Sequence, residues 1–167
     1  MNNMAIDNIS IPGTGADIAA HTNQFLTFTL AEEEYGIDIL KVQEIKGYVP
    51  TTRVPNSPPE VIGVLNLRGT VVPIIDLRRK FNLPEATYDQ FTVIVVVVVQ
   101  ERVMGVIVDS VSEVMNIPGE DIQPPPNVGS KGVNTLKGMG KVGDKLIILL
   151  DIDTVLLGEG TLTSIAA

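Results

Sequence analysis

The side chains of this 167-residue sequence offer little material for catalysis. There is no cysteine, which excludes disulfides, thiolate metal sites and cysteine nucleophiles. The single histidine, His21, lies in a polar N-terminal stretch, whereas a catalytic base must be held rigidly. None of the serines sits in a Gly-x-Ser-x-Gly elbow, and Lys131 and Gly132 lack the glycine spacing of a phosphate-binding loop. We therefore expect a protein that is not an enzyme and that has no cofactor and no metal.

One acidic pair suggests a site for a hard cation, but it has a simpler explanation, and an acidic run elsewhere does not suggest one. Asp151 and Asp153 lie where a strand is expected to pass into a helix, and aspartate commonly caps a helix at that position. The run Glu32–Glu34 is expected to be a solvated turn. Metal binding is therefore not predicted at either place.

Two other charged residues stand among apolar neighbours and are candidates for binding. Arg68 lies in NLRGTVVPIIDL, at a glycine turn between apolar segments, and Glu44 lies in DILKVQEI, between Val42 and Ile45. Each could be a surface charge beside a strand. Alternatively the two form a pair on a binding surface, where arginine often contributes strongly to affinity. The spacing alone leaves both interpretations open.

The composition indicates an aliphatic core and protein partners. Hydrophobic residues make up 44% of the chain and aromatic residues only 4%. The net charge of −8 argues against a nucleic-acid partner, because phosphates require a basic face. No secretory signal opens the sequence, and no apolar run reaches the roughly 18 residues of a membrane-spanning helix. We therefore expect no direct membrane insertion.

Short strands must hold the candidate residues, because apolar and polar residues alternate along much of the chain. Strands are expected at Gln24–Leu30, Tyr35–Ile39, Val71–Leu77, Val93–Val99, Val103–Val108 and Leu146–Asp151. Pro73 suggests that its strand is an edge or carries a bulge. The run Val93–Val99 is apolar at every position, so both of its faces must be covered.

A few helical turns are expected between these strands. Pro59 could open a short helix through Val64, Leu77–Phe81 could form one or two turns, and Asp151–Leu157 a terminal helix. Ile39–Ile45 is open between a helical turn and a strand.

The second half of the sequence repeats the pattern of the first. Tyr35–Ile45 aligns without a gap on Met104–Val114, which places Gly36 on Gly105. Further along, Gly63 aligns with Gly138, and the motif IIDL of the first half aligns with LLDI of the second. Two copies of a short all-β unit suit two small barrels, because closing a sheet into a barrel removes its exposed strand edges.

Three blocks in order closely resemble the CheW coupling proteins of bacterial chemotaxis: EEEYGIDILKVQEIKGY, VIGVLNLRGTVVPIIDLRRKF and VMGVIVDSVSEVM. The likeness runs from about Phe25 to Leu157. It implies an all-β fold of two SH3-like five-stranded β-barrels that share a hydrophobic interface, with a few short helices. We expect tails at 1–23 and 159–167 around a domain at 24–158. The first barrel would cover roughly 24–88 and the second roughly 89–158, with strands possibly exchanged between them.

The resemblance also implies a function. Proteins of this family are non-catalytic adaptors that join the cytoplasmic tips of chemoreceptors to the regulatory domain of the histidine kinase CheA. We expect the same partners here, with a monomer in isolation that assembles into arrays. The location would be cytoplasmic, at the inner face of the membrane through the receptors. The alternative is a small-ligand-binding β-barrel or an enzyme outside chemotaxis, which needs convergent polar groups in a pocket.

The matching motifs assign residues to partner binding. By resemblance, Arg68 and Glu44 are the functional charged pair. The other positions that the family uses for receptor or kinase contact correspond to Ile39, Val42, Val93, Gly105, Val111 and Val114.

Overall fold

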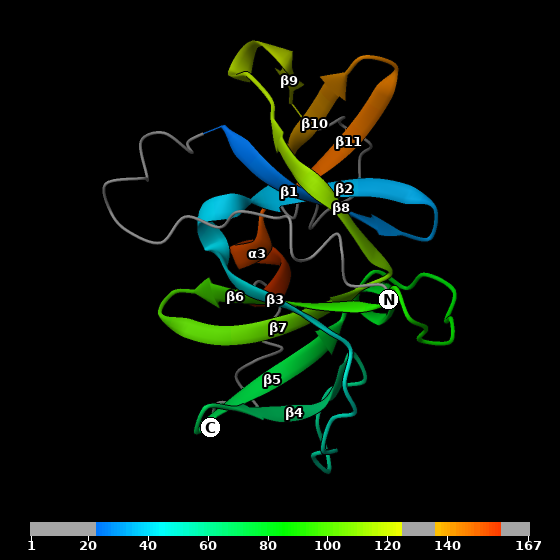
Figure 1. Ribbon diagram of the computed structural model, residues 1–167, viewed down its shortest axis with the longest axis vertical. Coiled ribbons are helices and arrows are strands. Elements are labelled where there is room, and N and C mark those ends of the chain that lie inside the picture. The colour runs from blue at the N-terminus through cyan, green and yellow to red at the C-terminus, as the bar shows by residue number, and fades with distance from the viewer. Residues whose placement is uncertain (1–22, 125–135, 158–167) are drawn as a thin grey trace.

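The computed structural model describes residues 23–124 and 136–157, which form two stacked β-sheets joined by short helices (Figure 1). The sheet at the top of Figure 1, the upper sheet, has the strand order β8-β1-β2-β11-β10-β9. Its strands are β1 (Gln24–Leu30), β2 (Glu33–Asp38), β8 (Ser110–Asn116), β9 (Ile122–Gln123), β10 (Leu136–Val142) and β11 (Lys145–Leu150).

The lower sheet has the strand order β3-β6-β7-β5-β4. Its strands are β3 (Val42–Gly47), β4 (Val61–Leu67), β5 (Thr70–Asp76), β6 (Val93–Val99) and β7 (Arg102–Val108). The predicted all-β fold of two SH3-like barrels is confirmed. The upper sheet differs in detail from the five strands expected, because the two-residue strand β9 adds a sixth.

The short helices lie at the connections between strands. They are η3 (Ile39–Lys41), α2 (Leu77–Lys80), η4 (Gly119–Asp121) and α3 (Ile152–Leu157). The predicted helices at Leu77–Phe81 and Asp151–Leu157 are thus confirmed. Asp151 caps α3 as expected, since its Oδ1 accepts a hydrogen bond of 3.4 Å from the backbone N–H of Thr154.

The helix predicted from Pro59 through Val64 is wrong, because β4 begins at Val61 and pairs antiparallel with β5. The β-branched residues of this segment suit a strand once a partner is available. The ambiguous stretch Ile39–Ile45 divides between η3 and β3.

The strand β5 is not an edge, because it lies between β7 and β4. Its pairing with β7 begins at Ile74, one residue after Pro73. The missing N–H of Pro73 therefore interrupts none of the pairing with β7, and a proline can sit in an interior strand here.

Each sheet takes strands from both of the segments 24–88 and 89–158. Four pairings make this exchange: β5 runs parallel beside β7 and β2 beside β11, and β1 pairs antiparallel with β8 and β3 with β6. The aligned glycines occupy matching places in the parallel pairings, since Gly105 stands opposite Ile74 and Gly36 opposite Leu149. The duplication seen in the sequence is therefore present in the strand pairing. The bounds of the domains along the chain stay a prediction.

The valine strand β6 separates two cores by the alternation of its side chains. Val93, Val95, Val97 and Val99 join a cluster with residues of the upper sheet, including Leu26 and Phe28. Ile94 and Val96 point the other way, into a cluster with the β5 residues Val72 and Ile74. The run is apolar on both faces because one face fills its own barrel and the other faces the neighbouring barrel.

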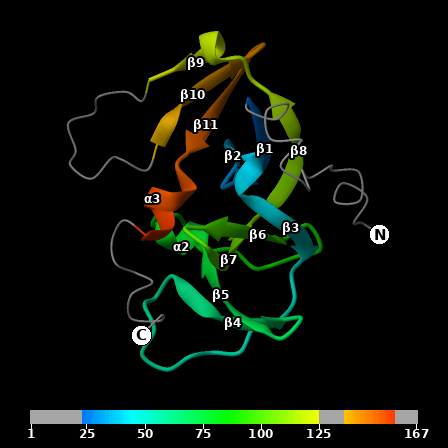
Figure 2. The same ribbon diagram turned by 90° about the vertical axis from the view of Figure 1, so that its left-hand side faces the viewer.

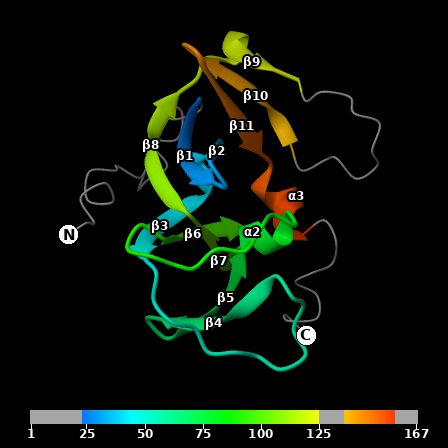
Figure 3. The ribbon, with the colours of Figure 1, turned by 90° about the vertical axis from the view of Figure 1, so that its right-hand side faces the viewer.

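The upper barrel has an interior cluster of its own, formed by Phe25, Ile117, Ile147 and Leu149. Side chains thus fill both barrel interiors, and the cluster between the sheets is a third, shared core. Figures 2 and 3 show α3 between the two sheets, where its residues Val155 and Leu156 are fully buried in the shared core.

The packing at Gly105 predicts a steric cost for any side chain. A Cβ atom at Gly105 would lie 2.7 Å from Cδ1 of Ile74 and 3.0 Å from Cγ2 of Ile94. We expect Gly105→Ala to lower the free energy of unfolding by about 1–3 kcal/mol, because both neighbours are buried and must shift. Urea denaturation measures this change. Gly119→Ala is the matched control, since its Cβ would meet nothing within 4 Å, and equal stability of the two variants would contradict the packing.

Candidate functional site

Arg68 is held in a left-handed backbone conformation at the tip of the β4–β5 hairpin. Its φ is 52° and that of the following Gly69 is 90°, the pattern of a two-residue type I′ turn. The Oδ1 of Asn66 accepts a 2.8 Å hydrogen bond from the backbone N–H of Gly69 and fixes the turn. The β1–β2 and β6–β7 hairpins have the same left-handed pattern at Ala31–Glu32 and Gln100–Glu101, so this backbone conformation belongs to the tight hairpin turn.

Arg68 forms an ion pair with Glu44, as the second interpretation of the sequence predicted. The hydrogen bond to Glu44, together with the charge of that carboxylate, raises the pKa of Arg68 further. Glu44 lies on β3 and Arg68 beside β4, which are the two edge strands of the lower sheet. The pair therefore bridges the two edges and helps to curl the sheet into a barrel.

The ion pair lies on the surface, since 68% of the Arg68 side chain and 28% of the Glu44 side chain are exposed. Exposed ion pairs contribute little to stability because water screens them. Beside the pair is a hollow of about 200 Å³, lined by Arg68, Gln43, Thr70 and Val103 among others. A charged pair and a hollow are thus combined on one surface.

The other residues assigned by resemblance lie mainly in the interior. Ile39, Val42, Val93 and Val111 belong to the shared core, with at most 8% of their surface exposed. Gly105 is buried against Ile74. The structure therefore brings Glu44 and Arg68 together but gives these five residues contacts inside the protein. Their role in partner binding stays a prediction.

Val114 differs, because it is only partly buried and packs at the rim of the shared core. It lies on β8, the edge strand of the upper sheet, whereas Ile45 lies at the same rim on β3, the edge strand of the lower sheet. Figures 2 and 3 show these two edge strands on the same side of the molecule, one above the other. We call the apolar rim between β3 and β8, with Ile45 and Val114, the seam. The sequence did not single out Ile45, although it directly follows Glu44.

Asp109 fixes the two sheets to each other where the chain crosses from β7 to β8. Arg78 donates two hydrogen bonds to this carboxylate, at 2.8 Å to Oδ1 and 2.6 Å to Oδ2. The backbone N–H of Ala31, in the β1–β2 turn, donates another to Oδ2 at 2.9 Å. Arg78 thus links α2 of the lower part to a turn of the upper sheet. No sequence motif predicts this contact, because its partners are far apart along the chain.

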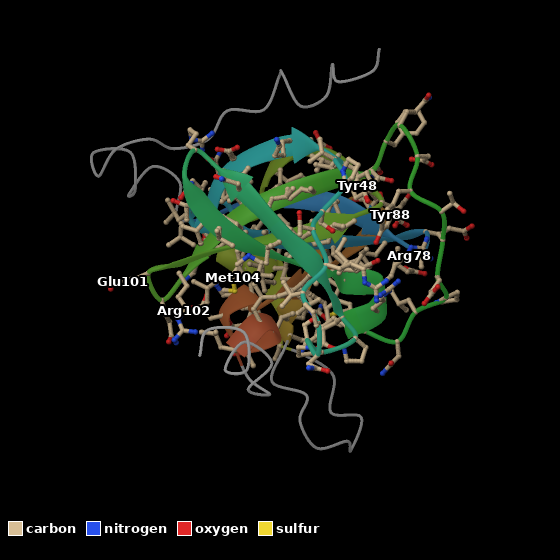
Figure 4. All side chains as sticks on the ribbon, turned by 90° about the horizontal axis from the view of Figure 1, so that it is seen from below. Tyr48, Arg78, Tyr88, Glu101, Arg102 and Met104 are labelled. Carbon is tan, nitrogen blue, oxygen red and sulfur yellow. The ribbon has the colours of Figure 1, made fainter. Side chains whose placement is uncertain are left out.

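A tyrosine pair closes the same end of the lower barrel (Figure 4). The rings of Tyr48 and Tyr88 pack with centroids 4.5 Å apart, and the Tyr88 hydroxyl donates a 2.6 Å hydrogen bond to Oδ2 of Asp76. Burial and this hydrogen bond to a carboxylate raise the pKa of Tyr88. Asp76 also accepts from the backbone N–H of Arg78 and so caps α2.

The described parts of the chain show neither a metal-binding cluster nor a membrane-spanning helix. In residues 23–124 and 136–157, no group of three or more histidine, cysteine, aspartate or glutamate residues could hold a metal ion. No helix in these ranges is long and apolar enough to cross a membrane. His21 lies outside the described residues.

Comparisons with known proteins agree on one family. The family model for the CheW-like domain matches residues 24–159. Chemotaxis protein CheW of Klebsiella aerogenes is 48% identical over 137 residues, which cover 81% of this chain and 82% of that protein. Chemotaxis protein CheW of Helicobacter pylori is 38% identical over 133 residues, covering 80% and 81%. The crystal structure of the scaffolding protein TtCheW from Thermoanaerobacter tengcongensis matches with a TM-score of 0.77 and 34% identity, covering 83% of this chain and 95% of that one.

The contacts of Asp109 predict an acid-sensitive link between the sheets. Burial alone would raise the pKa of Asp109, but the hydrogen bonds from Arg78 and Ala31 and the charge of Arg78 lower it overall. A carboxylate with a lowered pKa adds stability above its unfolded-state pKa and loses it as the pH falls. Asp109→Asn should therefore be less stable than the unchanged protein near pH 7, and this difference should shrink below about pH 4. Urea denaturation across this range tests it, and a difference independent of pH would contradict it.

Proposed function

Because the chain belongs to the CheW-like domain family, we propose that it couples the cytoplasmic tips of chemoreceptors to the regulatory domain of the histidine kinase CheA. A chemotaxis coupling role follows from the family and from the likeness to the TtCheW scaffolding protein. The named partners, and a cytoplasmic location beneath the membrane through the receptors, are the proposal. The adaptor performs no reaction, so its surfaces and not a catalytic centre carry the function.

The observation that carries the proposal is the exposed Glu44–Arg68 pair on its left-handed turn. Since the pair adds little stability, an exposed arginine that is fixed at a hairpin tip beside a hollow is better explained by recognition of a partner. The arginine has donors beyond those that Glu44 uses, and the adjacent hollow can take an apolar side chain of the partner.

The seam supports a second contact with different chemistry. Its rim residues Ile45 and Val114 are apolar and only partly buried, and they border the shared core between two edge strands. An amphipathic helix can lay its apolar face on such a surface, and the receptor tip offers a helical hairpin. Separate contacts for receptor and kinase allow one molecule to bind both. The proposal has the isolated protein as a monomer. In an array, many weak contacts of this kind act together and so give strong overall binding.

The proposal predicts that reversal of the charge at Arg68 abolishes coupling. In membranes that contain the receptor and CheA, Arg68→Glu should lower the adaptor-dependent kinase activity about tenfold or more, because a central charged contact becomes repulsive. Phosphate transfer to CheA measures this activity. The exposed Lys141, on β10 of the upper sheet, supplies the matched control Lys141→Glu, which should keep the activity.

A charge swap separates recognition from a purely structural role. The double variant Glu44→Arg with Arg68→Glu re-forms an ion pair between the sheet edges. If the pair only closes the barrel, the swap restores coupling, whereas a direct partner contact leaves it defective. Circular dichroism and thermal unfolding confirm that each variant is folded. Full activation by folded Arg68→Glu would contradict the proposed site.

A further inference from the structure

A second hollow lies apart from the Glu44–Arg68 pair, under the loop between β3 and β4. It has a volume of about 540 Å³ and is open to solvent. Residues 53–59 and the start of β4 form its walls, and Arg79 reaches it from α2. The walls combine apolar groups with two guanidinium groups. The lining residues include Arg53, Val54, Pro55, Pro58, Ile62 and Arg79.

Hydrogen bonds and prolines hold this loop in shape. The Ser57 hydroxyl donates to the carbonyl oxygen of Val54 at 2.8 Å, and the backbone N–H of Val61 donates to the carbonyl oxygen of Pro58 at 3.0 Å. Arg79 Nη1 donates to the carbonyl oxygen of Pro59 at 3.2 Å and ties the loop to α2. Three prolines fix φ within the loop. Binding would therefore cost little ordering of the loop, because the hollow is already formed.

The charge of this hollow is opposite to that of the whole protein, whose net charge is −8. Within the described residues, Arg53 is exposed and has no ion-pair partner. Arg79 has the exposed carboxylate of Glu85 at 3.8 Å from its Nε, and one of its other donors is used by the carbonyl oxygen of Pro59. The nearby Glu60 forms an ion pair with Lys80, also at 3.8 Å. Two guanidinium groups thus remain available to an anion.

We propose that this hollow binds an extended acidic segment of a partner protein, by a contact independent of the Glu44–Arg68 surface. A carboxylate of the segment would accept hydrogen bonds from Arg53 and Arg79, which suit carboxylates well. A neighbouring apolar side chain of the segment would pack on Val54, Pro55 and Ile62. The apolar walls favour such a peptide over a small inorganic anion, which would leave them in water.

A peptide titration tests this inference. The probe is a short synthetic peptide, blocked at both ends, that alternates leucine and glutamate, and its companion carries glutamine in place of glutamate. Backbone amide shifts in two-dimensional nuclear magnetic resonance spectra of the full chain report the binding site. We expect saturable shifts at Val54, Ser57 and Ile62 with the glutamate peptide, and none with the glutamine peptide.

Arg53→Ala is the decisive variant, because within residues 23–124 and 136–157 no hydrogen bond or ion pair depends on Arg53. It should weaken the peptide affinity about tenfold, the effect of losing one charge-assisted hydrogen bond. Arg102→Ala is the control and should leave the affinity unchanged. Figure 4 shows Arg102 on the opposite side of the molecule from Arg78, the neighbour of Arg79 in α2.

Several results would overturn the inference. These are an absence of shifts around the hollow, equal shifts with both peptides, or an affinity that Arg53→Ala leaves unchanged. Citrate that binds as tightly as the glutamate peptide would point to a small anion instead. Shifts that appear when the protein alone is concentrated would assign the hollow to a second copy of the chain. None of these results bears on kinase coupling through Arg68, which is measured separately.

Discussion

The parallel pairing of β5 with β7 and of β2 with β11 is the constraint on which the rest of the structure depends. Because of these pairings, neither sheet can be completed by the strands of one half of the chain alone. The glycines at the two pairings, Gly36 and Gly105, allow buried side chains of the other half to approach the backbone. Since the valine strand β6 also faces two cores, the two barrels share one packing unit. We infer that they unfold together, because exposure of the shared core would follow the loss of either barrel.

The same exchange positions the surfaces that the proposed function needs. It leaves β3 and β8 as edge strands on one side of the shared core, which creates the seam. Asp109 stands where the chain passes between the sheets, and its bonds to Arg78 and Ala31 fix their relative orientation. The Glu44–Arg68 pair bridges the edges of the lower sheet and carries exposed charge. An adaptor must hold two partners at a fixed relation, and a rigid unit with separate surfaces suits this task.

Much of this fold can be predicted locally. Alternation and β-branched residues give β1, β6 and β7, and the repeated glycines reveal the duplication. The helix-start signal of Pro59 wrongly predicts a helix where β4 lies, because the antiparallel pairing of β4 with β5, the next strand of its hairpin, decides the outcome. The parallel pairings and the Arg78–Asp109 contact join residues that are far apart along the chain, which local patterns do not record. Motif resemblance identified Glu44 and Arg68 as a pair, but it could not distinguish buried positions such as Val93 from exposed ones.

The central claim is that one molecule of this protein holds receptor and kinase at the same time. Sedimentation velocity tests it directly, with the full chain mixed with a soluble receptor-tip hairpin and the regulatory domain of CheA. The account predicts a single complex that contains all three components and sediments faster than either complex of two. If the receptor hairpin and the kinase domain displace each other from the protein, they compete for one surface, and the account is contradicted.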